Sequence, residues 1–259
     1  MIFALQERTN DMLSEEQKKV KKILLTPIEC TTQETLTVFL YNNRIFSSQK
    51  YNGFDPDMSD FAVEFYQVIY KEKLAKLGYN ILDEKGNLKV LEKYKEFCGD
   101  TMNSYNTIEK RLNDDIKKKL KNKYHCLANF WILPMDVGHS SSWTITRALG
   151  KYSKSKKGID DYMDKFMEYY LENNEEYSKV YPEYTKSFPL DTFATDHFLK
   201  DIYVENNKVT ESMKFSHKEV DDIANEMCKR IEKRAELIAL EKGTELYKFF
   251  LDLGIVQLI

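Results

Sequence analysis

The residues best suited to binding chemistry lie in one basic segment in the middle of the chain. Between Ile116 and Lys157 the sequence has ten Lys or Arg residues and a single acid, Asp136, whereas the whole chain has 39 basic and 42 acidic residues. The segment is therefore strongly positive within a chain whose net charge is −3. Such an asymmetry is typical of a protein with an anionic partner.

Aromatic side chains are interleaved with these cations. Cations that neutralise phosphates, placed among rings on which bases can stack, are the ingredients of a nucleic-acid-binding surface. An alternative interpretation needs no ligand, because the run Phe130–Leu133 is apolar enough for a buried element and lysines are commonly just solvated. The predicted ligand-binding residues are Lys117, Lys118, Lys119, Lys121, Lys123, Trp131, Trp143, Arg147, Lys151, Lys154, Lys156 and Lys157.

A second group of polar residues, His125, Asn129 and His139, could supply two imidazoles and an amide to a metal ion. These residues have no recognised ligand spacing, and a histidine beside an apolar run is more often a hydrogen-bonded structural residue. The serine run 140–142 lacks the turn of a nucleophile elbow, and the sequence has no Gly-rich phosphate loop. We therefore predict no catalytic residue, no metal and no cofactor, and we favour a binding protein over an enzyme.

The length and composition of the sequence indicate a globular, helix-rich protein. Its 259 residues allow one domain over residues 1–259, or two closely packed lobes with a boundary near residues 100–116. Apolar residues are 42% and charged residues 31%, with only 9 Gly and 5 Pro. The sequence shows neither a signal peptide nor an apolar run of ~20 residues. Its four scattered cysteines are typical of reduced thiols. We expect a cytoplasmic protein without a membrane partner.

Hydrophobic periodicity and capping patterns predict a mainly α fold with one small β-hairpin. The hairpin is expected over residues 81–90, around Gly86. Residues 35–39 fit a strand as well as a helix. In the first half of the chain, helices are expected over residues 15–25, 31–46, 61–78 and 91–97. A further helix is expected to pass through Ile108 and lead into the basic segment. In the second half, helices are expected over residues 159–171, 191–202, 216–243 and 245–253.

Three blocks in the middle third of the chain resemble a group of bacterial and phage proteins. The blocks are Gly99–Tyr105, His125–Pro134 and Asp160–Asp164. The resemblance implies a bacterial or phage origin and carries no activity with it. The pattern His125-x-x-x-Asn129 before an apolar run also resembles a segment of HNH-type nucleases. Those enzymes need a further upstream metal-binding pair, and the expected hairpin near Gly86 has no histidine.

The leading hypothesis is a protein whose central basic segment binds nucleic acid or another polyanion. One alternative is a metal-dependent, nuclease-like enzyme that uses His125, Asn129 and His139. The other is a protein–protein interaction factor in conflict between phage and bacterium. The apolar C-terminal residues 254–259 would suit a homo-oligomer contact.

Overall fold

A computed structural model describes residues 13–32, 35–40, 43–48, 56–76, 97–102, 109–134, 175, 178–179, 181–200, 202, 204–205, 208–209 and 219–258. The fold is mainly α, as predicted, and its strands form small antiparallel sheets. Within the described part, no helix is both long and apolar enough to cross a membrane.

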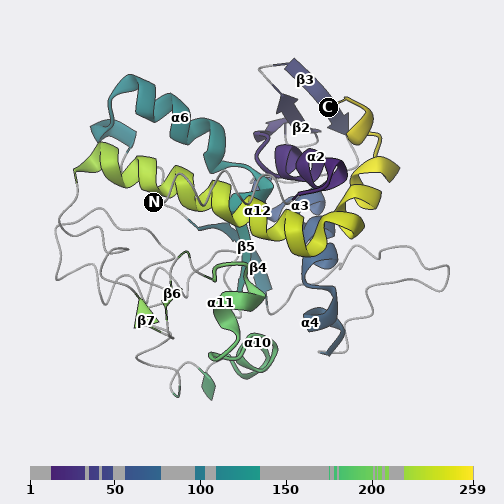
Figure 1. Cartoon of the computed structure of the whole chain (residues 1–259), viewed down its shortest axis with the longest axis vertical. Coiled ribbons are helices and arrows are strands. Elements are labelled where there is room, and N and C mark those ends of the chain that lie inside the picture. The colour runs from purple at the N-terminus through teal and green to yellow at the C-terminus, as the bar shows by residue number, and fades with distance from the viewer. Residues whose placement is uncertain are drawn as a thin grey trace.

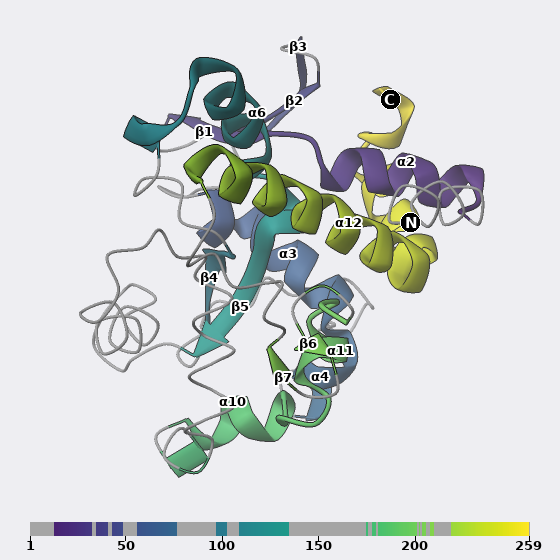
Figure 2. The same cartoon turned by 60° about the vertical axis from the view of Figure 1, so that its left-hand side comes forward.

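The long helix α12, Val220–Asp252, is the central element of the structure (Figure 1). Helix α6, Asp114–Tyr124, lies along its N-terminal half, and α2, Glu15–Leu24, lies along its C-terminal half (Figure 2). The predicted capping box of α2 is confirmed, because Ser14 and Gln17 bond reciprocally to each other's backbone N–H. Helix α2 then ends near the predicted position, before Pro27.

Gly243 does not end α12, so the two helices predicted over 216–243 and 245–253 are one. The glycine has a packing role instead. A Cβ atom at Gly243 would lie 2.6 Å from Cγ of Gln17, so the absent side chain is what lets α2 approach α12 this closely. The contact with α2 offsets the low intrinsic helix propensity of glycine.

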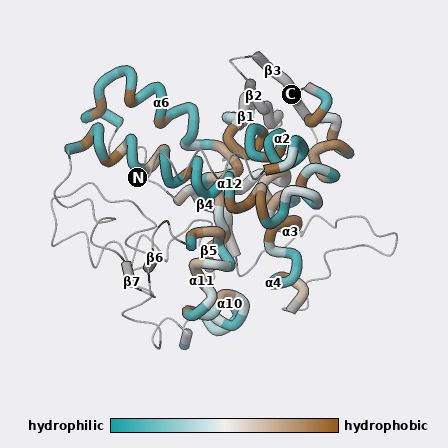
Figure 3. Tube along the Cα trace, in the orientation of Figure 1, coloured by the Kyte–Doolittle hydropathy of each residue, from teal (hydrophilic) through white to brown (hydrophobic). Residues whose placement is uncertain are grey.

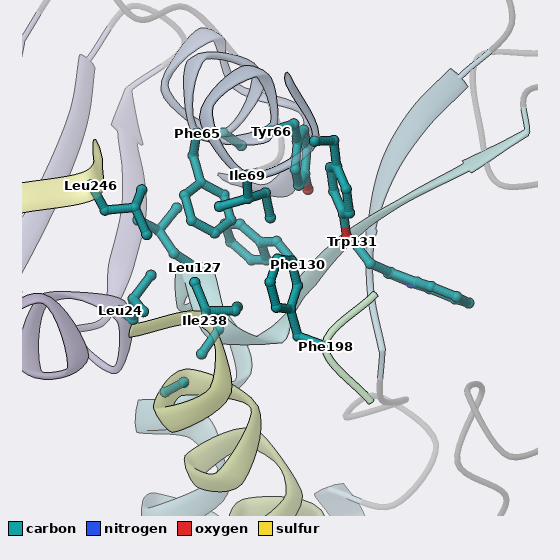
Figure 4. Close-up of a cluster of buried hydrophobic side chains, with 14 of the residues drawn as sticks. Leu24, Phe65, Tyr66, Ile69, Leu127, Phe130, Trp131, Phe198, Ile238 and Leu246 are labelled. Atoms are coloured by element: carbon teal, nitrogen blue, oxygen red, sulfur yellow. The ribbon is translucent and has the colours of Figure 1, made fainter. Parts of the chain in front are cut away.

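The main core lies between α12, α2 and α3, Asp60–Ile69, and continues over α4, Lys71–Lys76. Strands β4, Phe97–Thr101, and β5, Phe130–Pro134, pair antiparallel beneath α12. Figure 4 shows Phe130 among the side chains of this core. A smaller cluster joins α6 to the first part of α12 through Leu112, Leu120 and Met227.

The prediction of a helix over residues 31–46 is wrong, and the alternative prediction of a strand over residues 35–39 is confirmed. Strands β1, Ile28–Thr32, β2, Thr35–Leu40, and β3, Asn43–Ser48, form an antiparallel sheet in the order β1-β2-β3. The β-branched residues Thr35, Thr37 and Val38 favour the extended backbone, and in this segment that preference outweighed the helical spacing of the apolar residues. The hairpin predicted over residues 81–90 lies outside the described residues.

Several predicted boundaries shift. Phe97, expected to end a helix, begins β4, and residues 91–96 and 159–171 lie outside the described part. The helix expected over 191–202 is only α11, Phe193–Asp196, and the connection before it contains α10, Pro182–Ser187. Two short strands, β6, Val204–Glu205, and β7, Lys208–Val209, follow. Single 3₁₀ turns occupy Pro56–Met58, Glu109–Arg111, Leu127–Asn129 and Val256–Leu258.

Candidate functional site

Helix α6 carries the first five lysines of the predicted basic segment, and the structure divides them into two sets. Lys117 pairs with Glu109 at 3.0 Å, and Lys123 pairs with Glu232 of α12 at 2.6 Å. Lys119 Nζ donates to Asn225 Oδ1 of α12 at 3.0 Å. These three side chains therefore hold α6 to its neighbours.

Lys118 and Lys121 form the second set. Both are exposed, and neither has an ion pair within the described part of the chain. They are three residues apart, so they lie on the same outer face of α6. Figure 3 shows α6 as mostly hydrophilic along its length. Lys110 and Arg111, in the 3₁₀ turn just before α6, are exposed as well.

Trp131 is not part of a solvent-facing surface. Its side chain is 0% exposed, and in Figure 4 its indole points away from the other labelled core residues. The ring packs edge-on against His197, with centroids 5.8 Å apart. The prediction that Trp131 offers a face for base stacking is therefore wrong, because β5 lies beneath α12 inside the molecule.

His125 and Asn129 are held by local structural contacts. Asn129 is 0% exposed, and its Nδ2 donates to the carbonyl of Tyr124 at 2.8 Å. The His125 ring lies over Tyr124 at 4.6 Å, and its backbone carbonyl accepts a hydrogen bond from the N–H of Ile28. The described residues contain no group of three His, Cys, Asp or Glu side chains that could hold a metal ion.

The other predicted site residues lie outside the described part of the chain. They are His139, Trp143, Arg147, Lys151, Lys154, Lys156 and Lys157. The structure therefore brings together only the α6 portion of the predicted binding segment.

Two of the three blocks of the resemblance are neighbours in space. Gly99 pairs with Ile132, Asp100 with Trp131 and Thr101 with Phe130 across β4 and β5. Beyond the strands, the N–H of Met102 donates to the carbonyl of Asn129. Gly99 crosses so close to the 3₁₀ turn at residues 56–58 that a Cβ atom there would lie 2.0 Å from the carbonyl oxygen of Asp57.

A buried arginine, which sequence reasoning missed, lies at the centre of the core. Arg234 of α12 is 0% exposed, and no carboxylate pairs with it among the described residues. Its Nη1 donates to the carbonyls of Ala128 at 2.8 Å and Phe130 at 2.7 Å, and its Nε donates to the carbonyl of His197 at 2.9 Å. Carbonyl dipoles thus take the place of a counter-ion and offset the cost of burying the charge.

The hydrogen bonds of Arg234 continue through Tyr70, His197 and Tyr184. Tyr70 Oη accepts from Arg234 Nη2 at 3.2 Å, so its own proton is available for His197 Nδ1 at 3.0 Å. Tyr184 Oη donates to the carbonyl of Ile132 at 3.2 Å and lies 3.3 Å from His197 Nε2. Because Tyr70 donates to Nδ1, a neutral His197 carries its proton on Nε2 and donates it to Tyr184. All the hydrogen bonds of this network therefore run in one direction, from Arg234 to the carbonyl of Ile132.

Burial sets the ionisation of this chain of groups. It lowers the pKa of His197 well below its ordinary value, and the nearby Arg234 and Lys73 charges lower that pKa further. Burial also raises the pKa of Tyr70 to about 12, although Arg234 opposes the shift. The arginine is therefore the charged member of a network in which the His197 imidazole and the Tyr70 phenol are neutral.

A strained backbone at the end of α11 presents the His197 carbonyl to Arg234. Phe198 has φ 58°, which is uncommon for a bulky residue, and its side chain is only 3% exposed. Asp196, two residues before Phe198, is held by Lys73 at 2.6 Å and by the hydroxyl of Thr192 at 2.7 Å. These contacts fix the turn, so the network joins α4, α11, β5 and α12.

Comparison with known proteins identifies no relative. No family model, no curated protein and no solved structure matches the chain. The resemblance to bacterial and phage proteins and the similarity to an HNH-type segment therefore stay predictions.

Proposed function

We propose that this protein binds the phosphate backbone of a single-stranded nucleic acid, with the outer face of α6 as part of the contact. The observation that carries the proposal is the division of the α6 lysines. Lys117, Lys119 and Lys123 are engaged by neighbouring side chains, whereas Lys118 and Lys121 remain in solvent. Cations without a protein partner can release counter-ions when they neutralise phosphates.

The way α6 is held supports this role. Leu120 packs into the small cluster with Met227 and Cys228, and the three engaged lysines add polar contacts on either side. The opposite face is therefore presented from a fixed helix, so little order is lost when a ligand binds to it. The remaining cations of the predicted segment follow β5 in the sequence and are part of the hypothesis.

A simpler explanation for the lysines is the helix dipole. Asp114 and Asp115 lie in the first turn of α6, and Lys121 and Lys123 lie in the last, which is the arrangement that stabilises an isolated helix. This explanation accounts for position along the helix and predicts no ligand. The two explanations therefore separate in a binding experiment.

The test is the affinity for a fluorescently labelled single-stranded DNA, measured by anisotropy at several salt concentrations. We expect Lys118→Glu/Lys121→Glu to weaken binding at least tenfold, because the charge of the contact is reversed at two positions. The control is Lys19→Glu/Lys71→Glu, which makes the same change of net charge at two exposed lysines of α2 and α4. The control should bind within about twofold of the wild-type protein.

Competitors identify the ligand class. Heparin and poly-glutamate compete equally with DNA if charge alone is recognised, whereas stacked bases give nucleic acid an advantage. Equal affinity of the α6 variant and its control would overturn the role of α6. The absence of salt-sensitive binding to any of the three polyanions would overturn the proposed function itself.

A further inference from the structure

Helix α12 has a second apolar stripe on its exposed side, and two members of the stripe, Leu237 and Tyr247, also pack against the edge of the core. Leu240 is 43% exposed and Leu251 is 40% exposed, and they are the exposed large hydrophobic residues of the described chain. They are separated by about three helical turns and therefore lie on the same side of the helix. Leu237, Thr244 and Tyr247 fall on the same side, so the stripe has the alternating three- and four-residue spacing of a coiled-coil seam.

The two flanks of this stripe differ. On one flank lies α2, because Gln17 Nε2 donates to the carbonyl of Leu240 at 3.2 Å and Lys21 pairs with Glu236 at 3.1 Å. On the other flank, Glu241 and Lys248 are both exposed, seven residues apart. One flank is thus already packed. The other carries Glu241 and Lys248, and Glu241 is also close to Lys242 and Lys200 of its own chain.

We propose that this stripe pairs two copies of the chain through antiparallel α12 helices. In that arrangement Leu240 packs against Leu251 of the partner subunit, and the same contact recurs across the two-fold axis. Thr244 and the part of Tyr247 that the core leaves exposed fill the centre of the seam. Each exposed leucine is then covered by the other, which is the self-complementarity that a two-fold interface requires.

The charges of Glu241 and Lys248 favour a second copy of the chain over an unrelated apolar partner. They also favour antiparallel over parallel helices. In an antiparallel pair the open flanks face each other, so Glu241 lies within reach of Lys248 of the partner subunit, twice per dimer. A parallel pair would set this flank against the α2 flank of the other copy, where Gln17 and Lys21 already engage α12. A seam of about four turns is at the small end of specific interfaces, so the dimer is reversible and concentration-dependent.

Disulfide trapping tests the direction of pairing. A mixture of Leu240→Cys and Leu251→Cys proteins should form a cross-linked dimer on mild oxidation, because the two positions face each other across the seam. Leu240→Cys alone should not form a cross-linked dimer, because the two cysteines at position 240 lie about three helical turns apart along the antiparallel pair. That separation is beyond the ~7 Å that a disulfide spans. The wild-type protein measures the background. Cross-linking of Leu240→Cys alone would overturn the antiparallel pairing.

Charge exchange tests the pairing itself by sedimentation equilibrium. We expect Glu241→Lys and Lys248→Glu each to weaken the dimer at least fivefold. The double variant Glu241→Lys/Lys248→Glu should restore association, because each new cation meets a new anion across the axis. Leu240→Glu/Leu251→Glu should be monomeric with an unchanged circular dichroism spectrum, since both leucines are exposed. A wild-type protein that stays monomeric at all concentrations, or a double variant as weak as the singles, would overturn the proposal.

Discussion

The molecule carries positive charge in two contrasting places, the outer face of α6 and the buried position of Arg234. The α6 lysines are numerous, close in sequence and satisfied by carboxylates, an amide or water. Arg234 is single, fully buried and satisfied by three backbone carbonyls and a tyrosine hydroxyl. The comparison teaches that the same charge serves differently by location: on α6 it leaves Lys118 and Lys121 exposed to solvent, whereas the lone buried cation joins distant parts of the fold.

The largest expected effect is the loss of Arg234. Arg234→Met should lower the free energy of unfolding by about 3–5 kcal/mol, because it leaves the carbonyls of Ala128, Phe130 and His197 buried without a donor. Urea denaturation measures the loss. The matched change on the surface, Lys118→Met, should stay within about 0.5 kcal/mol of wild type. Similar losses of unfolding free energy for Arg234→Met and Lys118→Met would contradict the contrast between the buried arginine and the surface lysines.

Next in size is the loss of the Tyr70 hydroxyl, which joins Arg234 to His197. Tyr70→Phe should cost about 1–3 kcal/mol of unfolding free energy, because Nδ1 of the buried imidazole loses its donor. Tyr184→Phe should cost less, since its bonds at 3.2 and 3.3 Å lie at the end of the chain of donors. If Tyr184→Phe cost more than Tyr70→Phe in urea denaturation, the assigned donor order would be wrong.

The pH dependence of stability follows from the lowered pKa of His197. The unfolded histidine titrates near 6.5, whereas the folded one titrates well below that value. The unfolded state therefore binds the extra proton first, and stability is lost as the pH falls below about 6.5. Relative to His197→Gln, wild type should lose up to about 1.4 kcal/mol per pH unit in this window. Parallel stability curves for the two proteins between pH 5 and 7 would contradict the buried neutral imidazole.

The smallest effect distinguishes the two sets of lysines within α6. Lys123→Met should cost about 0.2–1 kcal/mol, because the pair with Glu232 is partly shielded, with side chains 19% and 37% exposed. Lys121→Met should change the free energy of unfolding by less. A reversed order in thermal or urea denaturation would show that the division of α6 into anchoring and free cations is incorrect.

Local signals in the sequence predicted much of the helical fold. The capping box at Ser14 placed α2, and the apolar spacing of Phe61, Phe65 and Ile69 placed α3. The prediction failed where a contact distant in sequence decides the structure. The sequence around Gly243 predicts a helix end, but α12 continues through it and the missing side chain makes room for Gln17 of α2. Thr35–Leu40 forms a strand because it pairs with β1 and β3.

The site was harder to predict than the fold, for a related reason. Charge counting found the α6 lysines, but it could not separate Lys118 from Lys119, because the partner Asn225 is more than 100 residues away. Trp131 was assigned to the surface by its neighbours in sequence, although the pattern Phe130–Leu133 also fitted a buried strand. Nothing in the sequence marks Arg234, since one arginine in a charged helix has no local signature.

The salt dependence of DNA binding tests the central claim most directly. Neutralising two phosphate-contacting lysines should reduce the slope of log affinity against log salt concentration by about 1.4 for a single strand. We expect this change for Lys118→Gln/Lys121→Gln and an unchanged slope for the control Lys19→Gln/Lys71→Gln. Equal slopes for the two variants and the wild-type protein would contradict the assignment of the α6 face to polyanion binding.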